Sequence, residues 1–194
     1  MDLADFLPRV PRGDLWVFGY GSLMWSPRFP HTDKSPAMLH GYHRALCILS
    51  RRHRGTEARP GLVMGLCPGG SCWGMAFRVE AKRVQRTLEI LWRREMLRKV
   101  YEPRLVSVRV KRGRLVTAIA FIADRSHPSV VREMDLRSRA QLVAQGIGER
   151  GPCTEYVRKT LEHMYALGVT DPHLARVLET AVAMRASAAS RRAR

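Results

Sequence analysis

Residues 15–25 read LWVFGYGSLMW, an apolar segment that runs directly into two closely spaced glycines. Trp16, Val17 and Phe18 predict a short buried strand, and residues 19–23 predict a tight turn at its end. Two glycines let the backbone approach a ligand closely, so that successive amides can point at a carboxylate or carbonyl oxygen. The alternative, a turn that only terminates the strand, stays open from this spacing alone.

After this turn the sequence predicts one further single strand and then two strand pairs. Apolar and β-branched segments predict strands at 41–49, 62–66, 73–79, 106–110 and 115–123. The PGGS segment at 68–71 predicts a turn that joins 62–66 to 73–79, and KRGR at 111–114 predicts the turn of a second hairpin.

One helix is predicted between these hairpins, over 81–97, and the last third of the chain is predicted to be helical. Val84, Leu88, Leu91 and Trp92 recur at helical spacing and form an apolar stripe. This order of elements predicts an α+β fold with a mostly antiparallel or mixed, strongly curved sheet, and it argues against a doubly wound parallel sheet.

The length of 194 residues accommodates one well-buried domain. We expect a leader over 1–14, a single domain over 15–184 and a short basic tail over 185–194. The first residues are acidic and lack the basic and apolar regions of a signal peptide, and no segment has the long apolar run that crosses a bilayer. We therefore expect a cytoplasmic protein without membrane attachment, whose four cysteines stay free thiols.

The charge balance is strongly basic, because 34 Lys and Arg residues against 17 Asp and Glu residues give a net charge of +17. Such a surface attracts anions, whether a small substrate or a nucleic acid. The arginines are scattered along the chain without the interleaved stacking aromatics of RNA-binding motifs. We therefore expect no specific nucleic-acid partner, and a basic nucleic-acid-binding module is the alternative from another class of function.

Glu95 is the candidate for proton transfer. It follows Leu88, Leu91 and Trp92 by seven, four and three residues, so a helix places its carboxylate on the apolar stripe. Loss of solvation there, together with the negative end of the helix dipole, would raise its pKa. These are the conditions under which a carboxylate accepts a proton near neutral pH.

Ordinary surface pairing is the alternative for the carboxylates of this helix. Glu89 lies off the stripe and can pair with Arg93 across one turn. Glu95 could pair in the same way with Lys99 at a frayed helix end, and helical spacing alone does not decide between the two roles of Glu95.

The remaining chemistry-bearing residues give weaker indications. His40 and His43 lack a carboxylate or cysteine at a metal-ligand spacing, and Cys67 and Cys72 lack the second pair that would close a tetrahedral site. Ser22 does not stand in a GxSxG elbow, and no P-loop follows the first strand. The sequence therefore predicts no metal, no other cofactor and no serine nucleophile.

Taken together, these segments resemble the ChaC family of γ-glutamyl cyclotransferases, which act on glutathione. The matching stretches occur in the family's order from about residue 15 to about residue 180. They are WVFGYGSLMW at 16–25, GYHR at 41–44, RGT at 54–56, PG at 60–61, CWG at 72–74, RE at 94–95, Tyr101 with Pro103, and EY at 155–156.

The resemblance implies a small closed or nearly closed β-barrel with flanking helices. It also implies a cofactor-free lyase that converts glutathione to 5-oxoproline and cysteinylglycine by intramolecular attack of the α-amine on the γ-carbonyl carbon, with Glu95 as general acid/base. The substrate-binding residues that it implies are Val17, Phe18, Gly19, Tyr20, Gly21, Ser22, Leu23, Arg54 and Tyr156.

The expected partner is the small molecule glutathione, and the expected assembly is a monomer. Within the enzyme class, a cyclotransferase for other γ-glutamyl amines or dipeptides is the alternative. The glycine carboxylate distinguishes glutathione from these compounds, and Arg54 or a neighbouring arginine would have to recognise it.

Overall fold

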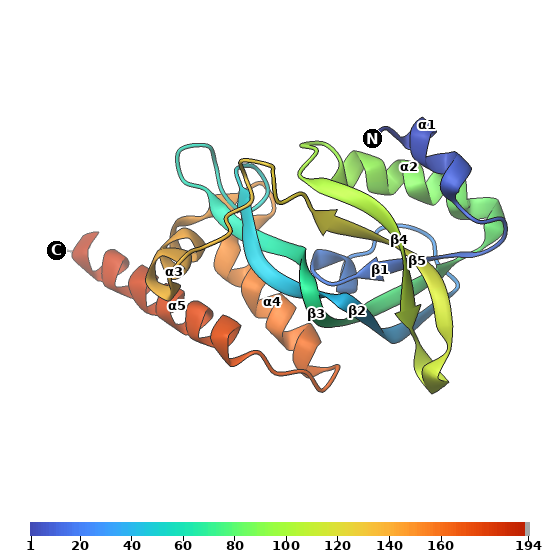
Figure 1. Cartoon of the computed structure of the whole chain (residues 1–194). Helices are drawn as coiled ribbons and strands as arrows, with labels where there is room; N and C mark the ends of the chain where they lie inside the picture. Colours follow the sequence, from blue (N-terminus) through green and yellow to red (C-terminus); the bar gives the residue numbers. More distant parts are fainter. Residues whose placement is uncertain (193–194) are drawn as a thin grey trace. The chain divides into compact units, whose positions relative to one another are not determined.

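The computed structural model describes residues 1–192 of the chain (Figure 1). These residues form two units. Unit 1 comprises residues 1–45 and 65–124, and unit 2 comprises residues 46–64 and the described residues from 125 onward. No helix in the described part of the chain is both long enough and apolar enough to cross a membrane.

Five strands close into a barrel in the order β1, β3, β2, β4, β5. Their bounds are Leu15–Gly19 for β1, Asp33–Ser50 for β2, Gly61–Val79 for β3, Tyr101–Arg109 for β4 and Leu115–Ala123 for β5. β1 runs antiparallel to β3 and parallel to β5, whereas β4 runs antiparallel to both β2 and β5. The mixed, closed barrel with flanking helices confirms the predicted α+β class.

β1 is buried along its whole length. Val17 pairs with Phe77 of β3 and Ile119 of β5, and the three side chains share the apolar core of unit 1. Helix α2, Val84–Glu95, adds Leu88 and Leu91, neither of which has exposed surface. Each such side chain contributes roughly 1.5–3 kcal/mol by burial, so the predicted apolar stripe fixes α2 within the same core as β1.

The N-terminal residues, predicted as a leader, include helix α1, Leu3–Phe6, and the 3-10 turn η1, Leu7–Arg9. Phe6 has no exposed surface, and its ring centroid lies 5.0 Å from that of Trp92 on α2. This contact packs the segment onto the core of unit 1.

The segment 68–71 is not a turn between two strands, because β3 runs without interruption from Gly61 to Val79. Gly69 and Gly70 have φ angles of +93° and +72° within it. A left-handed backbone favours glycine, so the two glycines accommodate a local distortion of one strand. The predicted hairpin of 62–66 with 73–79 is therefore wrong, whereas the hairpin of β4 and β5 is confirmed.

Unit 2 consists mainly of helices, as predicted for the last third of the chain. They are α3, Leu136–Gln145, α4, Cys153–Tyr165, and α5, Pro172–Arg192, and they contact one another (Figure 1). Asp135 caps α3 by accepting from the amide of Ser138 at 2.9 Å, and Asp171 caps α5 by accepting from the amide of Leu174 at 2.9 Å. The predicted basic tail is helical through Arg192, and residues 193–194 lie outside the described part.

Candidate functional site

After β1 the chain enters the 3-10 turn η2, Ser22–Met24. The amide of Met24 donates to Gly21 O at 2.9 Å and closes the turn. A Cβ on Gly19 would lie 2.8 Å from the Cβ of Leu23, so glycine is required where the turn folds back on the strand. The amides of Ser22 and Leu23 come before Met24, whose amide makes the first hydrogen bond of η2. The first amides of a helical turn have no acceptor within the turn, so they point outward as donors.

Most side chains of residues 17–23 are buried. Val17 and Phe18 have no exposed surface, and Tyr20 is 6% exposed with its hydroxyl donating to a carbonyl of β5 at 2.7 Å. Ser22 is half-buried. A ligand at this turn would therefore meet the Ser22 hydroxyl and backbone groups rather than the apolar side chains.

Arg44 of β2 holds the start of the turn. Its Nε donates to Tyr20 O at 2.6 Å, and its Nη2 donates to Trp73 O of β3 at 2.5 Å. Arg44 belongs to the GYHR stretch at 41–44, for which the sequence alone indicates no role. The structure makes it the cation that fixes the backbone of the turn against β3.

Glu95 is the last residue of α2, and its side chain is 17% exposed. Nε of Arg94 lies 2.8 Å from Glu95 Oε1. This contact is an ion pair without hydrogen-bond alignment, since Arg94 Nε has no aligned acceptor among the described residues. Glu95 is thus a mostly buried carboxylate beside a buried cation.

Arg94 also contacts the turn after β1. Its Nη2 donates to Ser22 Oγ at 2.8 Å, and its Nη1 donates to the carbonyls of Ser26 at 2.5 Å and Pro27 at 3.1 Å. The Arg94 side chain is only 8% exposed. One arginine therefore joins Glu95 to Ser22, so the two features that the sequence singled out separately lie together in unit 1.

Glu89 has the ordinary surroundings predicted for it. Its Oε2 lies 3.0 Å from Arg86 Nη1 and 3.9 Å from Arg93 Nη2, and its side chain is 32% exposed. The prediction of a surface pair with Arg93 is confirmed. The two carboxylates of α2 thus differ in burial and in the kind of cation beside them.

In unit 2, Arg54 is 8% exposed. Its Nη1 donates to Pro152 O at 3.1 Å, and its guanidinium lies 5.4 Å from the ring centroid of Tyr156. Burial lowers the pKa of the Arg54 guanidinium below its ordinary value, while the nearby Glu155 carboxylate acts in the opposite direction. Arg54 and Tyr156 are therefore brought into contact with each other, as a stacked cation and ring.

Tyr156 and Cys153 of α4 both contact the start of β3. The amide of Met64 donates to the Tyr156 hydroxyl at 3.0 Å, and Cys153 Sγ donates to Leu62 O at 3.0 Å. Burial raises the pKa of the Cys153 thiol to about 11. This cysteine is a buried, protonated structural group.

The histidines singled out in the sequence contact the distorted part of β3. His40 Nδ1 lies 3.0 Å from Ser71 Oγ, and His43 Nδ1 lies 3.0 Å from Gly69 O. Cys72 is buried, which raises the pKa of its thiol. Within the described residues, no group of three or more His, Cys, Asp or Glu side chains is placed to hold a metal ion.

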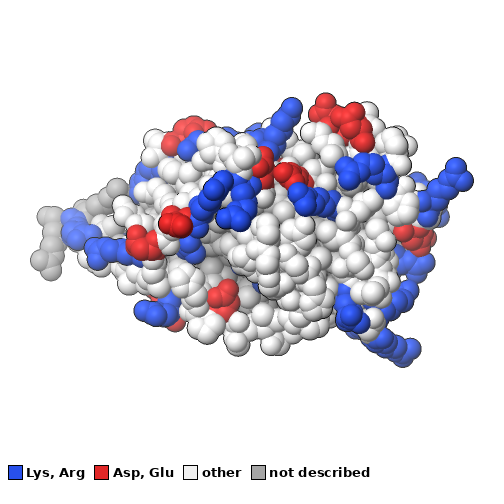
Figure 2. Space-filling model, viewed as in Figure 1, with Lys and Arg blue, Asp and Glu red and all other residues white. Residues whose placement is uncertain are grey.

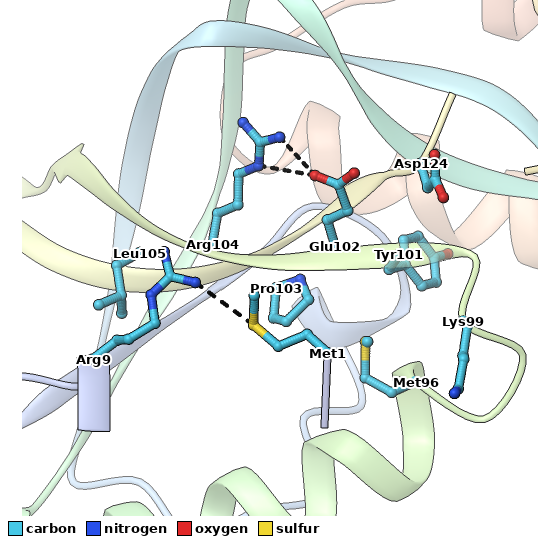
Figure 3. Close-up of a pocket in the computed structure, with 10 residues that line it drawn as sticks. All are labelled: Met1, Arg9, Met96, Lys99, Tyr101, Glu102, Pro103, Arg104, Leu105 and Asp124. Carbon is cyan, nitrogen blue, oxygen red and sulfur yellow. Dashed lines mark hydrogen bonds and ion pairs between the residues drawn. The ribbon is translucent and has the colours of Figure 1, made fainter. Parts of the chain in front are cut away.

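A cavity of about 650 Å³ in unit 1 lies where α2 ends and β4 begins (Figure 3). Its lining includes Met96, the residue after Glu95, and charges of both signs. Arg104 Nη2 lies 2.6 Å from Glu102 Oε2, which raises the pKa of Arg104. The cavity therefore offers mixed, partly compensated charges rather than a strong field of one sign.

A mixed five-stranded barrel with a glycine turn after its first strand defines the fold class. The same fold occurs in a crystal structure described as a γ-glutamyl cyclotransferase specific to glutathione from yeast, with a TM-score of 0.81. The two chains are 23% identical, and the match covers 90% of this chain and 98% of the yeast protein. The sequence model of the family described as ChaC-like protein matches residues 15–184, and the chain belongs to this family.

Curated relatives cover most of the chain. A protein of Escherichia coli (strain K12) named glutathione-specific gamma-glutamylcyclotransferase is 35% identical over 171 residues, which is 88% of this chain and 74% of the relative. A Schizosaccharomyces pombe protein of the same name is 34% identical over 177 residues, which is 79% of this chain and 86% of the relative.

Proposed function

We propose that this chain is a glutathione-specific γ-glutamylcyclotransferase, a lyase that releases 5-oxoproline and cysteinylglycine from glutathione. Membership of the ChaC-like family and the names of its relatives support this activity. The observation that carries the proposal is the contact of Arg94 with both Glu95 and Ser22. It places a mostly buried carboxylate beside a turn whose leading amides can hold a substrate oxygen.

The reaction needs one proton acceptor and a folded substrate. The α-amine of the glutamyl group attacks its own γ-carbonyl carbon, the new C–N bond closes a five-membered lactam, and the bond to the cysteine nitrogen breaks. On becoming the lactam nitrogen the α-ammonium loses two protons, and the leaving nitrogen gains two as it becomes the ammonium group of cysteinylglycine. Glu95 takes the proton that is released as the amine attacks and delivers it to the leaving nitrogen, and the other proton is exchanged through solvent. Because the attack is intramolecular, holding the glutamyl chain in a folded conformation contributes several kcal/mol.

The turn holds the substrate through its backbone. The amides of Gly21, Ser22 and Leu23 donate to the glutamyl carboxylate or to the developing oxyanion. The side chains of the preceding residues are buried, so these residues contribute by setting the path of the backbone into the turn. They are Val17, Phe18, Gly19 and Tyr20. Arg94 positions Glu95, and Arg44 positions the turn.

The proposed roles of Arg54 and Tyr156 rest on the family resemblance. Tyr156 covers the substrate, and Arg54 fixes the tyrosine ring through the stacked contact and the bond to Pro152 O. Arg54 is then a positioning residue, because its guanidinium already has these partners.

We further propose that the protein is a cytoplasmic monomer. It acts on glutathione without a cofactor, and it binds neither a specific nucleic acid nor a membrane. Cyclisation of other γ-glutamyl amines or dipeptides is the alternative within the same chemistry. The relatives' names favour glutathione.

The test is release of 5-oxoproline and cysteinylglycine from glutathione by the purified chain, with and without EDTA. We expect equal amounts of the two products, unchanged turnover in EDTA, and a lower kcat/KM for γ-glutamylalanine. Activity that is lost in EDTA and restored by a divalent ion would contradict the metal-free mechanism. A higher kcat/KM for γ-glutamylalanine would favour the alternative substrate class.

A further inference from the structure

A second cavity of unit 1, of about 410 Å³, lies beside the turn between β4 and β5. Pro36, Met38, Val110 and Trp73 form its apolar lining, and Trp73 is 40% exposed. Met38 is the register partner of Arg109, so the adjacent strands β3, β2 and β4 supply one continuous wall. A large exposed aromatic ring in such a wall is a stacking surface for a planar group.

The charged groups around this cavity are cationic. Arg109, Lys111 and Arg112 line it, and none of the three pairs with a carboxylate among the residues that the structure describes. Arg109 Nη1 donates to Gly113 O at 3.3 Å. Figure 2 shows Lys and Arg side chains projecting from the end of the molecule at which the turn between β4 and β5 lies in Figure 1.

The turn that carries these cations has a defined backbone. The amide of Val110 donates to Arg114 O at 2.8 Å across it, and the amide of Lys111 donates to Ser35 Oγ at 3.3 Å. Arg112 has a φ of 57°, a conformation that is uncommon for a residue other than glycine. The cations are therefore presented by a fixed turn next to the exposed indole.

This cavity and the one beside the end of α2 differ in their charge. In the larger one Glu102 compensates Arg104, and Asp124 adds a second acidic side chain to the lining. In the smaller one the lining combines an apolar wall, a tryptophan and only cationic charges. The lining of the smaller cavity thus combines an apolar aromatic surface with cationic side chains.

We propose that the cavity beside the turn between β4 and β5 binds a nucleoside phosphate. The base stacks on Trp73, and Arg109, Lys111 and Arg112 pair with the phosphates, for which guanidinium and ammonium groups are well suited. The volume lies within the range of small-molecule sites. None of the lining residues belongs to η2 or α2, and Trp73 is linked to the proposed substrate turn through its carbonyl, which accepts from Arg44.

Isothermal titration of the full chain at physiological salt with ATP, adenosine and tripolyphosphate tests the site. We expect ATP to bind at least about tenfold more tightly than either of its parts, because stacking and phosphate contacts add. Trp73→Leu should weaken ATP binding by about tenfold or more and leave tripolyphosphate binding unchanged. The double variant Lys111→Ala/Arg112→Ala should weaken the binding of both ATP and tripolyphosphate.

The matched control is Lys82→Ala/Arg83→Ala, which removes the same charge from exposed residues of unit 1 outside the cavity. It should leave ATP binding unchanged, and the thermal midpoint of every variant verifies its fold. Equal affinity for tripolyphosphate and ATP, or ATP binding that is insensitive to Trp73→Leu, would overturn the proposal. Binding of a single-stranded oligonucleotide without binding of ATP would overturn it as well and would indicate a nucleic-acid surface.

Discussion

Each unit contains a loop that is held by a buried arginine, and the two arginines differ in what surrounds them. Arg94 in unit 1 lies beside the carboxylate of Glu95 and donates to a hydroxyl and two carbonyls. Arg54 in unit 2 stacks on the ring of Tyr156 and donates to one carbonyl. The first arrangement places a titratable group next to the half-buried Ser22, whereas the second packs a cation against an aromatic ring.

This difference separates two kinds of contribution to an active site. A buried cation beside a carboxylate favours its charged form, which is the form that accepts a proton. A cation stacked on an aromatic ring fixes a shape but provides no proton acceptor. We therefore expect substitutions around Arg94 to change chemistry and substitutions around Arg54 to change packing and substrate retention.

The largest effect is expected from Glu95→Gln. The amide keeps the shape of the side chain but cannot accept a proton, so kcat should fall by roughly a hundredfold or more while KM changes little. Steady-state kinetics with glutathione measure this. Glu89→Gln on the same helix is the matched control and should keep its activity. Full turnover of Glu95→Gln would exclude Glu95 as the acid/base.

An intermediate effect is expected from Arg94→Gln. Loss of the cation misplaces Glu95 and the turn, so kcat should fall by about tenfold. A neighbouring cation favours the charged form of a carboxylate, so its loss should favour the protonated form of Glu95. The acidic limb of the plot of kcat against pH should therefore move to higher pH. Arg94→Lys restores the positive charge and should return that limb toward its original position. It should restore few of the hydrogen bonds that the planar guanidinium makes. A pH profile identical to that of the parent chain would contradict the positioning role.

The smallest effect on turnover is expected from Arg54→Gln. Loss of the stacked cation and of the bond to Pro152 should lower the free energy of unfolding by about 1–2 kcal/mol. KM should rise by the same factor for glutathione and for γ-glutamylcysteine, which lacks the glycine. Thermal unfolding and parallel kinetics with both compounds measure this. A rise in KM for glutathione alone would instead assign Arg54 to direct recognition of the glycine carboxylate.

Local patterns in the sequence predicted much of the fold. The apolar residues of β1, the helical spacing on α2 and the KRGR turn between β4 and β5 each depend on neighbours within one element. Gly69 and Gly70 misled the prediction, because positive φ angles occur both in turns and in distorted strands. Only pairing along the whole of β3 distinguishes these two cases.

The sequence indicated individual residues of the candidate site, but it did not indicate the long-range contacts that join them. The spacing on α2 indicated a buried position for Glu95, and its side chain is mostly buried. The bond from Arg94 to Ser22 joins residues that are 72 positions apart, so no local pattern could reveal it. The contact of Arg54 with Pro152 spans 98 positions and was hidden for the same reason.

The buried thiols of Cys72 and Cys153 have a consequence for the redox behaviour of the chain. Burial raises the pKa of both groups, so both remain protonated near neutral pH. Thiol–disulfide exchange proceeds through the thiolate and requires access to the sulfur. Mixed disulfides with glutathione disulfide therefore form slowly at these two positions, so under the proposed function these structural cysteines stay out of reaction with the oxidised form of the substrate.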